Sequence, residues 1–128
     1  MREAGAVYVA ERLHLVRIAL KKLRYALELK ADMAGGRAET PPLRVLRRGQ
    51  ELLGRLHDLQ VLIDRVRQMQ ASSSSPDLTA WRDLDLIVTT LENDSRRLHA
   101  RYMRQRSALE TLCERFGVRT EAAVRRAG

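Results

Sequence analysis

Cysteine, aromatic residues and long apolar runs are scarce or missing in this chain, and each of these shortages limits what the protein can be. Cys113 is the single cysteine among 128 residues, so no internal disulfide can form and no cysteine-based metal motif is present. Aromatic residues make up only 4% of the chain, so the core must be built from aliphatic side chains. No apolar run approaches the roughly 20 residues that span a bilayer. We therefore expect a cytoplasmic protein without a metal site or membrane insertion.

Motifs of known catalytic sites are also missing. The sequence has no glycine-rich phosphate loop, nucleophile elbow, HExxH sequence or pair of acids at a spacing that suggests metal or acid–base chemistry. Cys113 lies in an apolar stripe, which indicates an inert core thiol rather than a nucleophile. We predict no catalytic residue, no cofactor and no enzymatic activity.

Positive charge is abundant, and arginine carries nearly all of it. The chain holds 24 Lys and Arg against 16 Asp and Glu, a net charge of +8, and its only lysines are Lys21, Lys22 and Lys30. Guanidinium groups bind phosphate oxygens in a forked geometry. The composition therefore predicts an anionic partner.

Apolar residues recur at intervals of three and four along most of the chain, as in amphipathic helices. Two stretches rich in glycine, proline or serine interrupt this pattern, and they end in the helix-start signals Thr40 and Ser75. We predict a single all-α domain over residues 1–128, an antiparallel bundle of three to four long helices. The predicted helices cover about 6–33, 43–70 and 77–116, with a weak final helix after residue 117. The apolar residues of the third predicted helix fit either one long helix or two helices joined by a kink.

The first predicted helix carries a narrow stripe of cations. At about 100° per residue, four side chains fall within an arc of about 80°: His14, Arg17, Lys21 and Arg24. One flank is the expected core face, formed by Leu13, Val16, Leu20, Leu23 and Leu27. The other flank is a second apolar strip, formed by Leu15, Ile18, Tyr25 and Leu29. The cations are therefore bordered by apolar surface on both sides.

Two interpretations of this stripe remain open. Long Arg and Lys stems can cross apolar surface to reach water, in which case the stripe is an ordinary solvated face. Alternatively, it binds a polyanion, which would relieve the repulsion among Arg17, Lys21 and Arg24, like charges spaced three and four apart with no acid between them.

The later helices carry three further features. Gly54 lies inside the second predicted helix, where glycine costs about 1 kcal/mol relative to alanine, so we expect a neighbouring helix to approach closely there. We interpret His57 as a buried or half-buried hydrogen-bonding residue rather than a ligand contact. In the third segment, Arg97 and Arg101 share one face of a basic stretch.

Two segments resemble the motifs of a known family. The run LHLVRIALKKLRYALEL, residues 13–29, is similar to the signature helix of the CHAD family, the conserved histidine α-helical domain. The run LGRLHDLQVL, residues 53–62, resembles the second motif of that family at the right distance. The form KKLRYALE is most similar to the C-terminal half of the domain, and the chain has about half the usual length. The resemblance implies a helical bundle that binds inorganic polyphosphate through basic residues.

The resemblance also implies which residues bind the ligand. Its basic-helix positions correspond to His14, Arg17, Lys21, Lys22, Arg24 and Tyr25, and charge and helix order add Arg47, Arg48, Arg97 and Arg101. We therefore predict non-enzymatic polyphosphate binding, with nucleic-acid binding or a purely structural role in an assembly as alternatives. We also expect association with polyphosphate or storage granules. Finally, we expect a homodimer in which two copies stand in for the two halves of the domain and bury the second apolar strip.

Overall fold

Three α-helices form the part of the chain that the structure describes. The structure is a computed structural model, and it describes residues 2–35, 40–72 and 77–117. Helix α1 is Arg2–Met33, α2 is Pro41–Ser72 and α3 is Leu78–Arg115. No strand occurs in these residues, which confirms the all-α prediction. The third predicted segment is one uninterrupted helix, and the weak helix expected after residue 117 lies outside the described residues.

Local sequence signals set the starts of α2 and α3. Thr40 directly precedes α2, as predicted. The N-cap of α3 is Asp77 and not the expected Ser75, which lies outside the described residues. The Asp77 carboxylate accepts hydrogen bonds from the backbone amides of Thr79 and Ala80 at 3.1 and 3.2 Å. A carboxylate serves this role well because it also interacts favourably with the positive end of the helix dipole.

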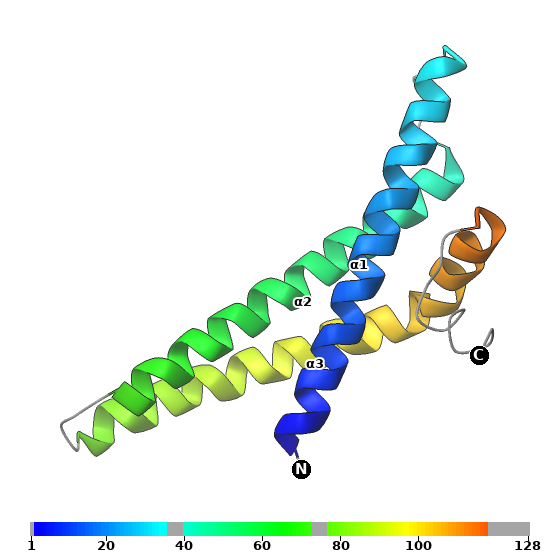
Figure 1. The fold of residues 1–128 in the computed structure, drawn as a ribbon. Coiled ribbons are helices and arrows are strands. Elements are labelled where there is room, and N and C mark those ends of the chain that lie inside the picture. The colour runs from blue at the N-terminus through cyan, green and yellow to red at the C-terminus, as the bar shows by residue number, and fades with distance from the viewer. Residues whose placement is uncertain (1, 36–39, 73–76, 118–128) are drawn as a thin grey trace.

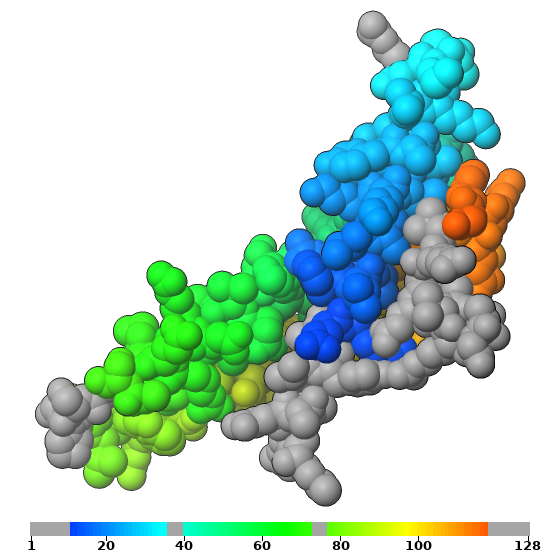
Figure 2. Space-filling model, in the orientation of Figure 1, coloured from blue at the N-terminus to red at the C-terminus, as the bar shows by residue number. Residues whose placement is uncertain are grey.

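Helices α2 and α3 form a long antiparallel hairpin, and α1 crosses it near one end (Figure 1). The last turns of α1 lie beside the first turns of α2, and the first half of α1 passes over α3. The other end of the hairpin projects beyond α1, as the green surface in Figure 2 shows. We call this two-helix part, residues 60–72 and 78–92, the arm, and we call the remainder of the described residues the head.

The head is held together by one aliphatic core. Its buried residues come from all three helices: Leu20, Leu23, Leu46, Leu52, Leu53, Leu56, Leu98, Tyr102, Leu109 and Cys113. The core face predicted for α1 is confirmed, since each of its five members lies in this cluster or packs against it. This packing leaves the cationic stripe of α1 at the edge of the core.

The arm has a second, smaller core. Ile63 and Val66 of α2 are buried against Val88 of α3, and Leu84 and Leu91 pack around them. The two helices of the hairpin therefore remain in contact beyond the region that α1 covers.

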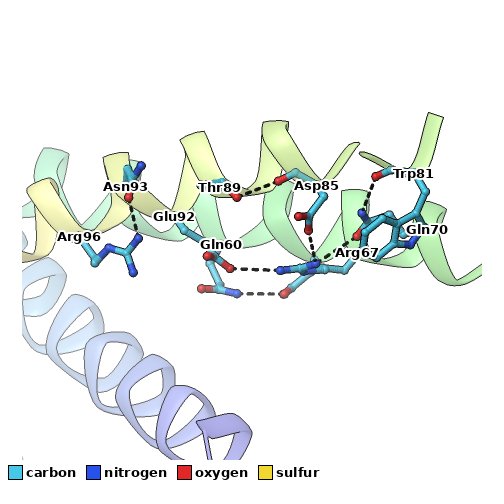
Figure 3. Close-up of polar contacts among 10 residues, drawn as sticks. Gln60, Arg67, Gln70, Trp81, Asp85, Thr89, Glu92, Asn93 and Arg96 are labelled. Atoms are coloured by element: carbon cyan, nitrogen blue, oxygen red, sulfur yellow. Dashed lines mark hydrogen bonds and ion pairs between the residues drawn. The ribbon is translucent and has the colours of Figure 1, made fainter. Parts of the chain in front are cut away.

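Arg67 links the two helices of the arm at their surface (Figure 3). Its Nη1 donates to Oδ1 of Asp85 at 3.2 Å, and its Nη2 lies 3.5 Å from Oε1 of Glu92. The neighbouring Gln70 accepts from Arg67 at 3.2 Å and donates from Nε2 to the carbonyl oxygen of Trp81, also at 3.2 Å. Because the ion-paired side chains are 42–48% exposed, we expect them to fix the register of the hairpin more than to add stability.

Gly49, and not the predicted Gly54, is where two helices approach closely. A Cβ atom at Gly49 would lie 2.8 Å from Cδ2 and 2.9 Å from Cδ1 of Leu109 on α3, too close for van der Waals contact. A Cβ atom at Gly54 would meet no atom within 4 Å. The prediction for Gly54 is therefore wrong, because this residue lies on the flank of α2 whereas Gly49 faces α3.

Cys113 lies in the core of the head, as its place in an apolar stripe predicts. Its side chain is 1% exposed. Burial raises the pKa of the Cys113 thiol to about 11, and the carboxylates of Glu110 and Glu114 shift it in the same direction. The thiol is therefore protonated at neutral pH, which makes it a poor nucleophile.

Candidate functional site

The cationic stripe of α1 lies at the surface of the head. His14 and Lys21 are exposed, and Arg17 and Arg24 are half-buried. This position follows from helix geometry, since the core face occupies one side of α1 and the stripe is the next sector around the axis. The predicted stripe therefore exists as a surface that a ligand can reach.

A strip of apolar residues lies on the other side of the stripe and is uncovered. Its predicted members Leu15, Ile18, Tyr25 and Leu29 are 50, 39, 51 and 62% exposed. The exposed Lys22 lies within this strip rather than in the cationic stripe, because a rotation of about 100° separates it from Lys21. An exposed strip in which apolar side chains outnumber the single lysine is typical of an interaction surface.

Glu28 joins the stripe of α1 to the basic surface of α2. Its Oε1 lies 3.5 Å from Nε of Arg24 and 3.8 Å from Nη2 of Arg47 on α2. No acid lies between the cations of the stripe in the sequence, but this one follows Arg24 by one helical turn. Part of the charge of Arg24 is therefore compensated within the protein. We call these three residues the Glu28 junction.

The ring of Tyr25 lies beside two cations of the same helix. The Nζ atom of Lys21 is 5.8 Å from the ring centroid, and Cζ of Arg24 is 5.1 Å from it. Cations at these distances are attracted by the electron-rich face of an aromatic ring. Tyr25 therefore helps to hold Lys21 and Arg24 near one another in spite of their like charge.

Arg97 and Arg101 lie away from the Glu28 junction, in a pocket between α2 and α3. The pocket has a volume of about 580 Å³, and Arg55 of α2 contributes to the same lining. Both predicted arginines are exposed. Of the predicted residues, the structure thus brings Arg24 and Arg47 together at the Glu28 junction and Arg97 and Arg101 together in the pocket. Arg48 is exposed on α2.

His57 departs from its prediction, and four charged site residues were not predicted: Glu28, Arg55, Asp58 and Asp94. His57 is exposed, so its interpretation as a buried or half-buried hydrogen-bonding residue is wrong. Glu28 was missed, although its spacing of four from Arg24 is a recognisable signal for an ion pair on a helix. Asp94, which lines the pocket, was missed as well, although it stands three residues before Arg97.

The part of the chain that forms the Glu28 junction also carries a family match. The family model described as CHAD domain matches residues 1–67. The chain belongs to the CHAD family. Within this CHAD chain the match spans α1 and most of α2, and α3 with its two predicted arginines lies outside it. The comparisons with curated proteins and with solved structures find no match.

Two further features of this CHAD chain concern membranes and metals. None of the helices in the described ranges is both long and apolar enough to cross a membrane. Among the same residues, no group of three or more His, Cys, Asp or Glu side chains is placed to hold a metal ion.

Proposed function

We propose that this CHAD chain binds inorganic polyphosphate and does not convert it chemically. Family membership supports the choice of ligand, because CHAD domains are associated with polyphosphate binding. The observation that carries the proposal is the Glu28 junction, where cations from α1 and α2 meet at the surface of the head. A polyanion that follows this surface would contact both helices.

The proposed binding residues have distinct tasks. Arg17, Lys21 and Arg47 present charge directly to phosphate oxygens, and the guanidinium groups can each bind two oxygens. Glu28 and Tyr25 hold their cationic neighbours in place. The full proposed set is His14, Arg17, Lys21, Lys22, Arg24, Tyr25, Arg47, Arg48, Arg97 and Arg101.

The exposed aromatic residues distinguish this ligand from nucleic acid. Single-stranded nucleic acids bind by stacking their bases on exposed aromatic rings as well as by phosphate contacts. In the described residues Tyr25 is 51% and Trp81 is 46% exposed, but Trp81 lies on the arm, away from the stripe. Among the side chains that the structure describes, Tyr25 alone offers a stacking surface beside the cations of the stripe, which favours a ligand that consists of phosphates only.

Parallel titrations separate the two ligands. We expect long-chain polyphosphate to bind more tightly than double-stranded DNA at two salt concentrations, about 0.05 M and about 0.2 M. At the higher concentration, counterion release has already weakened non-specific binding. Inorganic tripolyphosphate, which is too short to contact all the cations, should bind more weakly than the long chain. Equal affinity for DNA and polyphosphate at the higher salt concentration would contradict the proposal.

We further propose that two copies of the chain pair through the exposed apolar strip of α1. Burying Leu15, Ile18 and Leu29 in a two-fold interface would remove apolar surface from water. The positive stripes of the two copies repel each other, so they would line a shared channel rather than touch. Polyphosphate that binds across this channel would strengthen the dimer.

Sedimentation across a concentration series tests the dimer. We expect self-association at micromolar concentrations that increases with added polyphosphate and is lost in Leu15→Ser with Leu29→Ser. Both side chains are at least half exposed in the single chain, so these substitutions leave its core intact. A monomer at every concentration, with and without polyphosphate, excludes this interface.

A further inference from the structure

The pocket between α2 and α3 has charges of both signs and apolar surface in one lining. Its volume of about 580 Å³ lies within the range of roughly 300–1,000 Å³ that is usual for small-ligand pockets. Arg55, Arg97 and Arg101 supply cations, and Asp58 and Asp94 supply carboxylates. The apolar surface comes from Leu59, Leu62 and Leu98.

The five charged side chains of this pocket are available to a ligand. All five are exposed. Each lacks a hydrogen bond or an ion pair to any other residue in the described ranges, although the two signs share one lining. Their charges are therefore not neutralised by ion pairs within the described residues.

The mixed lining does not suit a ligand made of phosphates alone. Three guanidinium groups attract a phosphate chain, but each of the two carboxylates repels it. A carboxylate instead accepts hydrogen bonds from hydroxyl and amino groups. A ligand that uses the whole lining has an anionic end, hydrogen-bond donors and a flat apolar face.

We propose that the pocket binds a nucleoside polyphosphate. Arg55, Arg97 and Arg101 bind the phosphates, with Arg97 and Arg101 one helical turn apart on α3. Asp58 and Asp94 accept hydrogen bonds from the ribose hydroxyls or from the amino group of the base. The base lies against the leucine side chains. This site shares Arg97 and Arg101 with the polyphosphate-binding set proposed above, but it lies apart from the stripe of α1 and does not depend on whether that stripe binds polyphosphate.

ATP and inorganic tripolyphosphate are the matched probes for this site, because both carry three phosphates and only ATP has a nucleoside. We expect calorimetric titration without divalent cations to show tighter binding of ATP to the full chain. Asp94→Ala should weaken ATP binding about tenfold, the effect of losing a hydrogen bond to a charged group. The same substitution should strengthen tripolyphosphate binding, because it removes a repulsive charge.

Asp83→Ala is the control, since it removes the same charge from an exposed residue of α3 that does not line the pocket. We expect it to strengthen the binding of both probes slightly or to leave both unchanged. If Asp94→Ala shifts ATP and tripolyphosphate in the same direction, or if tripolyphosphate binds as tightly as ATP, the pocket is not a nucleotide site. Titration of long-chain polyphosphate into the same proteins keeps the two proposals apart. If polyphosphate does not bind, but Asp94→Ala still shifts the affinities for ATP and tripolyphosphate in opposite directions, only the function proposed for α1 is excluded.

Discussion

Glu28 and Tyr25 are the residues that let the head carry its cations so close together. Like charges three and four residues apart on a helix each cost a few tenths of a kcal/mol. Glu28 offsets part of this repulsion for Arg24 and Arg47, and the Tyr25 ring does so for Lys21 and Arg24. Arg17 has no such contact in the described residues and remains free for a ligand. Lys21 and Arg24 are therefore stabilised by contacts within the protein, whereas Arg17 is available to a ligand.

Cys113 makes the free energy of unfolding depend on pH in the alkaline range. A thiol in an unfolded chain has a pKa of about 8.5, and burial raises the pKa of Cys113 to about 11 in the fold. Between these values the unfolded chain has lost a proton that the folded chain keeps. The free energy of unfolding should therefore fall as the pH rises from about 9 to 11, by up to about 3 kcal/mol.

Urea melts of the wild type and Cys113→Ala over this pH range check the assignment. The variant should be less stable at neutral pH through lost packing, but it should lose less stability between pH values of about 9 and 11. Burial also raises the pKa of Tyr102, and that contribution largely persists in the variant, because the charge of Cys113 is the smallest of the causes of the shift. Parallel loss of stability in the two proteins would show that Cys113 is not the group that titrates.

At the scale of helices, Gly49 and Gly54 form a matched pair of substitutions on α2. Leucine at position 49 would force apart α2 and α3 at Leu109, so Gly49→Leu should destabilise the fold by about 1–3 kcal/mol. The side chain added by Gly54→Leu points into open space, and leucine is a much better helix former than glycine. This substitution should therefore stabilise the fold by up to about 1 kcal/mol. Thermal or urea unfolding of both variants measures the difference. A larger loss of stability at position 54 than at 49 would contradict this packing of α2 on α3.

Helix positions and faces were predictable, whereas contacts between helices were not. The periods of three and four depend only on the order of residues along one helix, so the core face and the exposed strip of α1 were predicted correctly. The close approach at Gly49 and the exposure of His57 depend on how α2 is rotated against α1 and α3. The pocket around Arg97 depends on the register of the hairpin, which the contacts of Arg67 with α3 and the arm core fix between two helices that are distant in sequence.

At the scale of the whole molecule, charge is divided between the head and the arm. The stripe of α1 and the arginines of α2 make the head basic, whereas the arm carries four acids and three arginines, a net charge of −1. A polyanion is attracted to the head and gains no net attraction from the arm. Polyphosphate that binds as proposed would follow the head, and we expect the cations of the arm to contribute little to binding.

Titration of long-chain polyphosphate into two double variants tests this central claim most directly. Arg17→Ala with Lys21→Ala removes two cations from the stripe, and Arg65→Ala with Arg82→Ala removes the same charge from the arm. The stripe variant should stay folded, bind at least about tenfold more weakly and show a salt dependence reduced by about one unit of slope per cation. The arm variant should bind within about twofold of the wild type, an estimate for distant screened charges. Equal losses in the two variants would show that polyphosphate responds to net charge alone and would contradict a binding site on the stripe of α1.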